Sequence, residues 1–557
     1  MRILKVWFVA LLLFYTAAAV QAQEENNFEI SKNLEIFGDV MRQLNLNYAD
    51  DIKPGELTQN AIDKMLQGLD PYTIYIPESR IEDFELMSKG EYGGIGAMIQ
   101  KLGDWVVISE PYEGFPAQKA GLKAGDEIRA IDGESAKGKT TKEVSERLKG
   151  TPGTEVSITI RHFGDTTDTT YRLKREKIKI PNVPYYGMVS DDIGYISLIQ
   201  FSTNAGNDVR NAFLALKSEH PNMKGVIFDL RSNGGGLLNE AVNIANIWIP
   251  KGQKIVTTKG KRAENTHTYY TKNKAVDAKI PLVILVDNGT ASASEIVSGS
   301  MQDLDRGVII GQRTFGKGLV QNVLPLPYNS KIKVTIAKYY IPSGRCIQAI
   351  NYFDRETGQR PNKIPDSLIS AFKTKHGRTV YDGGGIEPDI KMEERKFNQV
   401  TGDLYAQNYI FKFANLFVKN HPSIPPPSEF RISDSTFEAF KAFVGDQFDY
   451  KTETEELIKR LKESAQREGY DAALDSTIKR LEAEVKEAKK KDLDKNKEEI
   501  KELLRIEIVT RYYYQKGKVE ASLINDKEVK KAIEVIRDQS FYKSILNGTY
   551  KKEEKEK

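Results

Sequence analysis

Apolar residues recur at helical spacing in the first hundred residues of the chain. Ile36, Val40 and Leu44 are four residues apart, and this period places them on one face of a helix. Asp70-Pro71 then interrupts the pattern, as a proline after a turn-forming residue does. We therefore predict a helical N-terminal region over residues 23–90.

Between residues 91 and 178 the pattern changes to short strands separated by glycine turns. Residues 156–160 alternate apolar and polar positions, which is typical of a half-buried strand. Ile131-Asp132-Gly133 has the composition of a tight turn, and residues 141–148 have helical periodicity. This block is predicted to be a small, mainly β domain.

Residues 179–400 alternate apolar runs with amphipathic segments. The runs at 225–230, 281–287 and 308–310 are rich in Val, Ile and Leu, as strands buried on both faces of a sheet are. Helical segments follow the first two runs, and this order predicts an α/β domain.

The remainder of the chain, residues 401–557, is predicted to be helical and heavily charged. Lys and Glu recur at spacings of three and four residues between 455 and 507, which favours helices with a solvated face. The helical regions at the two ends of the chain are candidates for contacts in a homodimer or with an adaptor protein.

The first residues have the pattern of a secretion signal. Arg2 and Lys5 precede a short apolar run at 6–14, and small residues precede Gln23. This predicts a signal peptide over residues 1–22, and therefore an exported, periplasmic protein. The alternative is an uncleaved signal that keeps the protein at the membrane.

Composition narrows the function classes. The 557 residues include 82 basic and 78 acidic side chains, for a net charge of +4. A nearly balanced charge argues against a nucleic-acid partner. The five histidines are scattered without metal-ligand spacing, so we predict no metal site. Cys346 is the only cysteine and has no partner for an intramolecular disulfide.

Ser292 is the first candidate for chemistry. It follows a predicted buried strand and a turn at Asn288-Gly289, and the segment from Ser294 onward has helical periodicity. Ser292 is thus expected at or just before a helix N-terminus, where free amides and the helix dipole stabilise negative charge. Such a position suits the oxyanion of acyl transfer. The alternative is that both serines are only helix caps.

Lys317 is the second candidate, in Thr314-Phe315-Gly316-Lys317-Gly318. A lysine that loses its hydration can give up its proton and act as a base. In a strand, Lys317 and Gln321 share a face, so the glutamine is placed to orient the amine. Two alternatives are an exposed surface charge and a phosphate loop. Gly318 replaces the Ser or Thr that a phosphate loop uses for magnesium, and a strand rather than a helix is predicted to follow.

The block at 91–178 resembles a PDZ domain over its full length. The resemblance rests on Tyr92-Gly93-Gly94-Ile95-Gly96, Ala120-Gly121-Leu122, Gly125-Asp126 and the 141–148 helix. In that family, amides of the glycine loop hold the C-terminal carboxylate of a peptide that adds to the sheet as a strand. The resemblance implies that a peptide tail is bound by Gly93, Gly94, Ile95 and Gly96.

Four features then follow one another along the chain. They are the PDZ-like block, Asp229-Leu230-Arg231-Ser232-Asn233-Gly234-Gly235-Gly236, the turn at Ser292, and Lys317 with Gln321. As a set they resemble the carboxyl-terminal processing peptidases, also called tail-specific proteases, over residues 30–395. That family pairs a nucleophilic serine with a lysine 25 positions later and a glutamine four further on, as here.

This resemblance implies the roles of the site residues. Ser292, Lys317 and Gln321 would be catalytic, and the amides of Ala293 and Gly236 would form the oxyanion hole, with Gly235 as the neighbouring alternative. The implied fold is multidomain α/β. It has a catalytic core like that of Clp protease and crotonase, an inserted PDZ domain, and helical N- and C-terminal regions.

The implied function is that of a secreted serine endopeptidase with a Ser-Lys dyad. It would cleave protein or peptide substrates recognised by their C-terminal tails, through an acyl-enzyme and without a cofactor. One alternative is a non-catalytic peptide-binding scaffold of the same fold. Another is a crotonase-like acyl-transfer enzyme, against which the secretion signal and the PDZ-like block argue.

Overall fold

The structure, a computed structural model, describes residues 27–81, 84, 90–352, 362–445 and 448–550. The predicted signal peptide lies outside these residues. The described chain divides into two compact units: residues 27–75 with 323–334, and the remainder. We describe the two units separately.

The first unit confirms the predicted helices up to residue 67, whereas a strand at 74–76 shows that the helical prediction was wrong there. Residues 27–47 are helical, and α2 (Pro54–Gln67) follows. Pro54 occupies the first turn of α2, where its missing amide hydrogen has no intrahelical partner to lose. The chain leaves the helical pattern before Pro71 and continues into β1 (Ile74–Ile76).

The PDZ-like block forms one antiparallel sheet with two helices. Its elements are β3 (Ala97–Leu102), β4 (Trp105–Pro111), β5 (Glu127–Ile131), β6 (Glu134–Ser135), β7 (Glu155–Arg161), β8 (Asp168–Lys174), α4 (Pro116–Lys119) and α5 (Thr141–Leu148). The strand order is β3-β4-β5-β7-β8, with β6 beside β5. Thr140 and Glu143 cap each other's amides at the start of α5, so the predicted helix begins at this capping box. β2 (Glu91–Gly94) pairs separately with β9 (Glu176–Lys179).

The predicted α/β domain contains a six-stranded sheet of order β10-β11-β12-β15-β16-β23. Its strands are β10 (Tyr185–Ser190), β11 (Ile193–Ser197), β12 (Gly225–Asp229), β15 (Leu282–Val286), β16 (Val308–Gly311) and β23 (Ile390–Lys391). Only the edge pair β10–β11 is antiparallel, and the other neighbours are parallel. The three predicted buried strands are therefore confirmed at the centre of the sheet.

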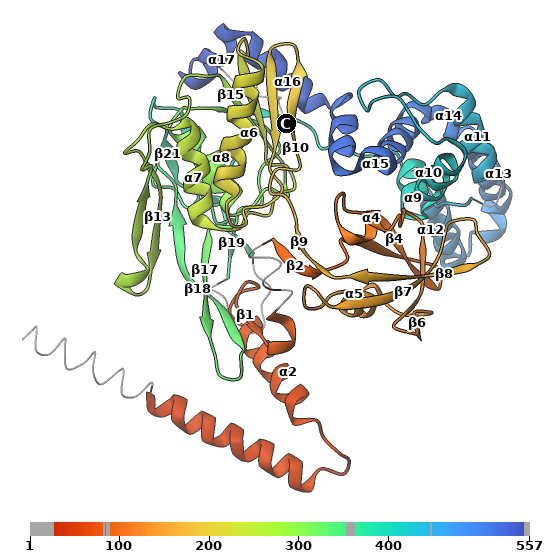
Figure 1. Ribbon diagram of the computed structural model, residues 1–557, viewed down its shortest axis with the longest axis horizontal. Coiled ribbons are helices and arrows are strands. Elements are labelled where there is room, and N and C mark those ends of the chain that lie inside the picture. Colours follow the sequence, from red (N-terminus) through yellow and green to blue (C-terminus); the bar gives the residue numbers. More distant parts are fainter. Residues whose placement is uncertain (1–26, 82–83, 85–89, 353–361, 446–447, 551–557) are drawn as a thin grey trace, which may run out of the picture. The chain divides into compact units, whose positions relative to one another are not determined.

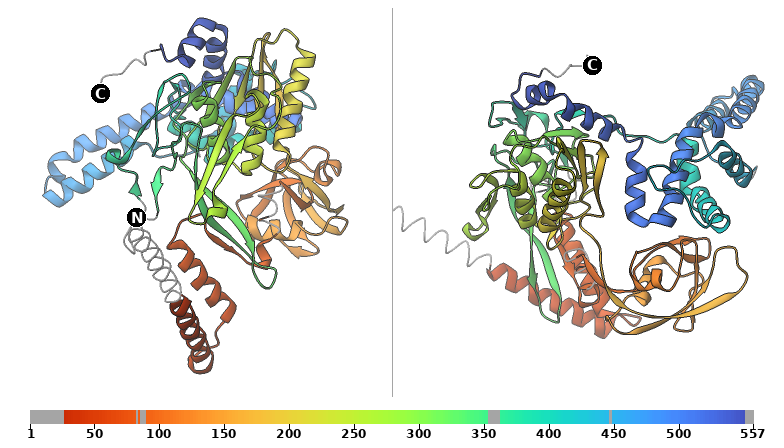
Figure 2. Two further views of the ribbon diagram at one scale, coloured as in Figure 1. Left: turned by 90° about the vertical axis from the view of Figure 1, so that its left-hand side faces the viewer. Right: turned by 45° about the horizontal axis from the view of Figure 1, so that its top comes forward.

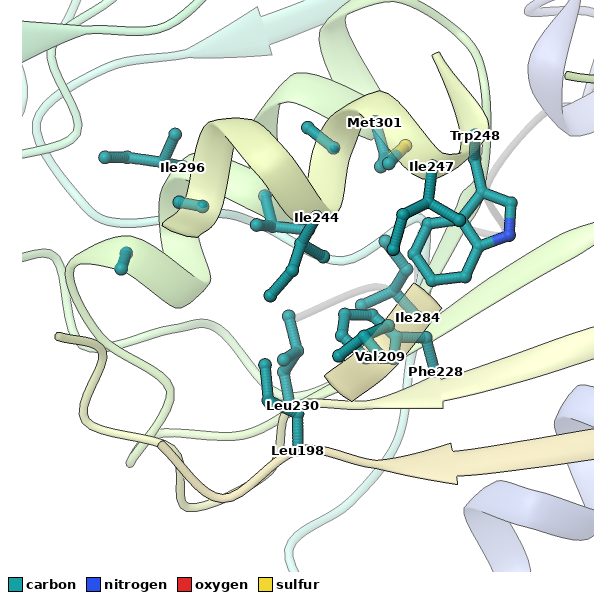
Figure 3. Packing of buried hydrophobic residues seen from close by; sticks show 14 of the residues in the cluster. Leu198, Val209, Phe228, Leu230, Ile244, Ile247, Trp248, Ile284, Ile296 and Met301 are labelled. Atoms are coloured by element: carbon teal, nitrogen blue, oxygen red, sulfur yellow. The ribbon is translucent and has the colours of Figure 1, made fainter. Parts of the chain in front are cut away.

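One face of this sheet is covered by α6 (Ala205–Glu219), α7 (Leu238–Trp248) and α8 (Ala293–Asp303). Phe228 and Ile284 point from the sheet into this layer and meet Trp248 and Met301 (Figure 3). The ring centroids of Phe228 and Trp248 are 5.2 Å apart. Burial of these large side chains fixes the helices on the sheet.

The opposite face is covered by helices from the end of the chain, α16 (Lys527–Arg537) and α17 (Gln539–Leu546) (Figure 1). Ile227 and Leu285 belong to this second cluster, whereas their chain neighbours Phe228 and Ile284 belong to the first. This alternation is the period of two expected of a strand with both faces buried. Part of the predicted C-terminal helical region thus packs directly on the sheet.

A second sheet carries the segment that follows Lys317. It contains β17 (Leu319–Pro325), β18 (Lys331–Tyr340), β13 (Lys254–Gly260) and β14 (His267–Tyr270). Short strands and single 3-10 turns make up the other irregular parts. They are β19 (Ile350–Asn351), β20 (Asn362–Lys363), β21 (Ala371–Lys373), β22 (Thr379–Tyr381), η1 (Glu78–Arg80), η2 (Ala263–Asn265) and η3 (Asp366–Leu368).

The remaining helices follow, and all of them except the α12–α13 pair contribute to a core that contains Phe413, Phe437, Phe440 and Leu504. They are α9 (Gln399–Ala406), α10 (Tyr409–Asn420), α11 (Asp434–Val444), α12 (Glu453–Glu468), α13 (Asp471–Lys489), α14 (Asp492–Lys495) and α15 (Lys497–Leu523). α12 and α13 lie side by side as a long hairpin (Figure 2). Within the described ranges, no helix combines the length and apolar character that a membrane span needs.

The core packing makes a direct prediction. Phe228 is completely buried, so Phe228→Ala leaves a cavity between β12 and α7. We expect the free energy of unfolding of the α/β domain to fall by about 3–5 kcal/mol, measured by urea denaturation. Tyr405→Ala, at an exposed position of α9, serves as a matched control and should change it by less than about 0.5 kcal/mol. Equal effects of the two changes would contradict this account of the core.

Candidate active site

Ser292 lies in a strained turn between β15 and α8. Its backbone has φ 56° and ψ −115°, a region that residues with a side chain rarely adopt. The side chain is half-buried, and α8 begins at the next residue. The structure therefore places Ser292 at a helix N-terminus.

The carboxylate of Glu295 holds this turn from inside the protein. Glu295 is fully buried, and its Oε2 accepts hydrogen bonds from the amide of Ser292 at 2.8 Å and the amide of Lys317 at 2.9 Å. The amide nitrogens of Ser292 and Lys317 are therefore at most two hydrogen-bond lengths apart. Glu295 was not among the predicted site residues, although Ser292-Ala293-Ser294-Glu295 has the S-x-x-E spacing of a capping box.

The other oxygen of Glu295 holds the segment 312–318, which carries Lys317 and is called the lysine loop below. Oε1 accepts hydrogen bonds from the Thr314 hydroxyl at 2.5 Å and the Gly316 amide at 2.8 Å. Burial raises the pKa of Glu295 to about 7, although these four hydrogen bonds lower it. The carboxylate needs all four donors, because an ionised group without partners is costly to bury.

Two glycines let the lysine loop approach its neighbours. Gly316 has φ +85°, and a Cβ at this position would lie 2.4 Å from the Cβ of Ala349. A Cβ at Gly318 would lie 2.8 Å from the amide nitrogen of Gln348. The loop continues into β17, so the strand predicted after Lys317 is confirmed. A phosphate loop would instead open a helix at this point.

Tyr339 is a second tie between the two candidate residues. It is buried in β18, and its hydroxyl donates to the carbonyl of Ser292 at 3.0 Å. Its own amide donates to the carbonyl of Gly318 at 2.9 Å. Tyr339 therefore fixes the Ser292 turn through its hydroxyl and the lysine loop through its backbone amide, and no role was predicted for it from the sequence.

The glycine run, Gly234-Gly235-Gly236, lies against the Ser292 turn. A Cβ on Gly235 would come within 2.8 Å of the Ser292 Cβ and of the Ala293 amide nitrogen. The buried Asn233 fixes the run, because its carbonyl accepts from the Ala291 amide and its side-chain oxygen accepts from the Gly235 amide. Asn233 belongs to the motif seen in the sequence, which by itself predicts no role for it.

Ser292 and Ser294 occupy different environments. The Ser294 side chain is fully buried, and its hydroxyl donates to the Asn233 carbonyl at 2.9 Å. The Ser292 side chain is half-buried. Ser294 thus acts as a structural link between α8 and the glycine run.

The remaining predicted site residues lie in separate places. Gln321 is half-buried in β17, two residues after the strand begins, and donates to the Thr335 hydroxyl at 3.2 Å. Gly93 and Gly94 belong to β2, while Ile95 and Gly96 form the turn into β3. Within the described ranges, no group of three His, Cys, Asp or Glu side chains is arranged to hold a metal ion.

Comparisons with known proteins show which family and domains the chain is similar to. The chain matches the sequence profile of peptidase family S41 over residues 192–353 and that of a PDZ domain over 107–162. A third profile, the C-terminal helical domain of a probable PDZ-protease, matches residues 400–536.

The chain matches two known proteases over most of their length. The carboxy-terminal-processing protease of Bartonella bacilliformis is 36% identical over 350 residues, which are 62% of this chain and 80% of that protein. A probable CtpA-like serine protease of Staphylococcus aureus is 35% identical over 385 residues, 67% of this chain and 76% of that one. The chain belongs to peptidase family S41. It is a serine peptidase with a PDZ domain and a helical C-terminal domain.

A solved structure is also similar to this peptidase. The photosystem II D1 C-terminal processing protease is 29% identical and covers 63% of this chain and 86% of its own, with a TM-score of 0.35.

The buried Glu295 predicts a pH-dependent stability. Its folded-state pKa of about 7 lies above the ordinary glutamate value of 4.5, so the folded peptidase binds this proton more tightly than the unfolded chain does. The contribution is complete below the unfolded pKa and is lost as the pH rises through the folded pKa. The stability of the parent relative to Glu295→Gln should therefore fall by about 3 kcal/mol as the pH rises over this window.

Thermal unfolding of both proteins across about pH 4.5 to 8 measures this difference. We expect the melting temperature of the parent minus that of Glu295→Gln to fall with rising pH and then to level off above the folded pKa. A difference that rises with pH, or that does not depend on pH, would show that Glu295 is ionised throughout.

Proposed function

We propose that this peptidase cleaves peptide bonds with a dyad of Ser292 and Lys317. The observation that carries the proposal is the convergence of their backbones on one oxygen of Glu295. Residues 25 positions apart in the sequence are thereby held side by side. Substrates are protein or peptide chains that reach this site after capture of their C-terminal tails.

In this mechanism Ser292 is the nucleophile. Its strained backbone and half-buried side chain resemble the strained turns that present nucleophiles in other hydrolases. Ser294 is less suited to the role, because its hydroxyl is buried and already donates to Asn233.

Lys317 is the general base. Its half-buried amine, in the neutral form, takes the proton of the Ser292 hydroxyl as this oxygen attacks the peptide carbonyl. A bound substrate excludes water from the amine, and desolvation favours the neutral form of a lysine. Gln321, four residues further on, is proposed to orient the amine from β17.

The amides of Ala293 and Gly236 are proposed to stabilise the oxyanion. Neither amide donates to another group in the part of the chain that the structure describes. Gly235 is less suited, because its amide donates to Asn233. Two preorganised donors at a helix N-terminus favour the negative charge of a tetrahedral intermediate.

The reaction then proceeds through an acyl-enzyme. Protonated Lys317 gives its proton to the leaving amine, and the C-terminal product departs. A water molecule attacks the Ser292 ester with Lys317 again as the base, and this step releases the second product. All proton transfers use side chains of the chain itself.

The PDZ domain is proposed to capture the substrate tail at Gly93, Gly94, Ile95 and Gly96. The amides of Ile95 and Gly96 make no hydrogen bond to the described residues, while their carbonyls accept from Ala117 and Tyr112. A turn fixed through its carbonyls leaves its amides for an anion.

The charged leader pattern of residues 1–22 supports export, and we propose a periplasmic location.

The dyad makes a prediction that separates the candidate serines. A fluorophosphonate probe should label the parent and Ser294→Ala but not Ser292→Ala. Lys317→Ala and Lys317→Arg should both reduce the rate of labelling and of peptide cleavage by at least about a hundredfold, because an arginine does not give up its proton.

Lys261→Ala, which removes an exposed lysine, is the matched control and should behave like the parent. Labelling that survives in Ser292→Ala and disappears in Ser294→Ala would transfer the nucleophile to Ser294. Near-parental cleavage by Lys317→Arg would exclude Lys317 as the base.

Tail capture makes a second prediction. A peptide with an apolar C-terminus and a free carboxylate should bind the inactive Ser292→Ala protein at least about tenfold more tightly than the same peptide with a C-terminal amide. The reason is that the amide lacks the charge-assisted hydrogen bonds to the loop. Calorimetry with both peptides measures the ratio, and equal affinities would rule out carboxylate recognition.

A further inference from the structure

Arg231 connects the glycine run to the C-terminal helices. It follows β12 by two residues, and its guanidinium contacts the carboxylates of Asp229 at 2.5 Å, Glu528 at 2.6 Å and Asp526 at 2.8 Å. All four side chains are at most 21% exposed. Such partly desolvated charge pairs hold a fixed geometry better than exposed ones.

Glu528 also reaches the other loop of the site. Its Oε2 accepts from Arg231, and its Oε1 accepts from the side-chain amide of Gln312 at 2.5 Å. Gln312 directly follows β16 and opens the segment that reaches Lys317 five residues later. One carboxylate of α16 therefore bridges the start of the glycine run and the start of the lysine loop.

The position of Glu528 is itself fixed. Asp526 caps α16 by accepting from the amides of Glu528 and Val529. Val529 and Ile536 are buried against the sheet face that contains Ile227. A side chain on a helix anchored in this way can hold two loops at a defined separation.

We infer that Glu528, supported by Asp526, is a positioning residue for the peptidase reaction. It sets the separation between the loop that carries the Gly236 amide and the loop that carries Lys317. The inference rests on the proposed function of those two loops. Glu528 contacts Arg231 and Gln312 and acts only through them.

Glu528→Ala tests the inference. We expect kcat to fall on the order of tenfold, because displaced catalytic groups lose alignment, while KM for a tail-bearing peptide stays within about twofold. Hydrolysis of p-nitrophenyl acetate, which has no peptide tail, should fall by the same factor. Glu534→Ala removes an exposed glutamate from the same helix and is the matched control.

Gln312→Ala removes the same bridge from the other side. It should lower kcat by a similar factor, and the double variant should lose no more than either single change, because residues of one bridge are not additive. If Glu528→Ala fails to reach the melting temperature of Glu534→Ala, Gln312→Ala and its kcat decide the question.

Two different failures can be told apart. Activity that survives in Ser292→Ala would overturn the proposed function. Ser292-dependent activity with kcat values of Glu528→Ala and Gln312→Ala within about twofold of the parent would overturn only the positioning role. A loss confined to KM, or independent losses that multiply in the double variant, would overturn it too.

Discussion

A single buried carboxylate holds together the site on which the proposed chemistry depends. Glu295 accepts from the amides of Ser292, Gly316 and Lys317 and from the hydroxyl of Thr314. The two loops are distant in sequence, and neither can move away without leaving part of this carboxylate unsatisfied. The strain of a positive φ at Ser292, which costs about 1–3 kcal/mol, persists because Glu295 and Tyr339 hold the backbone from two sides.

The second constraint is the space between the loops. Gly235 approaches Ser292 so closely that a side chain would displace the turn, and Gly316 approaches Ala349 in the same way. Main-chain groups thereby come near the Ser292 side chain, which a site built from amide donors requires. The glycines of the two motifs are therefore part of the geometry, whatever their individual amides donate to.

The local elements were predictable because their signals are local. The helix at 141–148 has its cap and its periodicity in adjacent residues, and the central strands are apolar enough to be recognised alone. The pair of Ser292 and Lys317 came from the spacing of a family motif. Their roles stay a prediction, supported by geometry that sequence reasoning did not provide.

The contacts that organise the site were not predictable in this way. Glu295 is one of 78 acidic residues, and only its spacing from Ser292 gave a signal. Tyr339 has the pattern of any strand residue, and its hydroxyl reaches Ser292, 47 residues earlier, only through the tertiary fold. Arg231 and Glu528 are almost 300 residues apart, so their ion pair depends on the tertiary fold.

The C-terminal region shows that composition alone does not tell which of its helices pack on the six-stranded sheet. Its charge comes from solvated helices such as α12 and α13, whereas α16 carries Val529, Ala532, Val535 and Ile536 on one buried face. α15 contributes Leu504 to the helical core and Leu523 to the cluster beneath the six-stranded sheet. Without these last helices the sheet would expose Ile227, Val283 and Leu285 to water, at a cost of about 25 cal/mol per Å². The hydrophobic effect thus joins to the catalytic sheet a segment that chain order and charge assign to a separate domain.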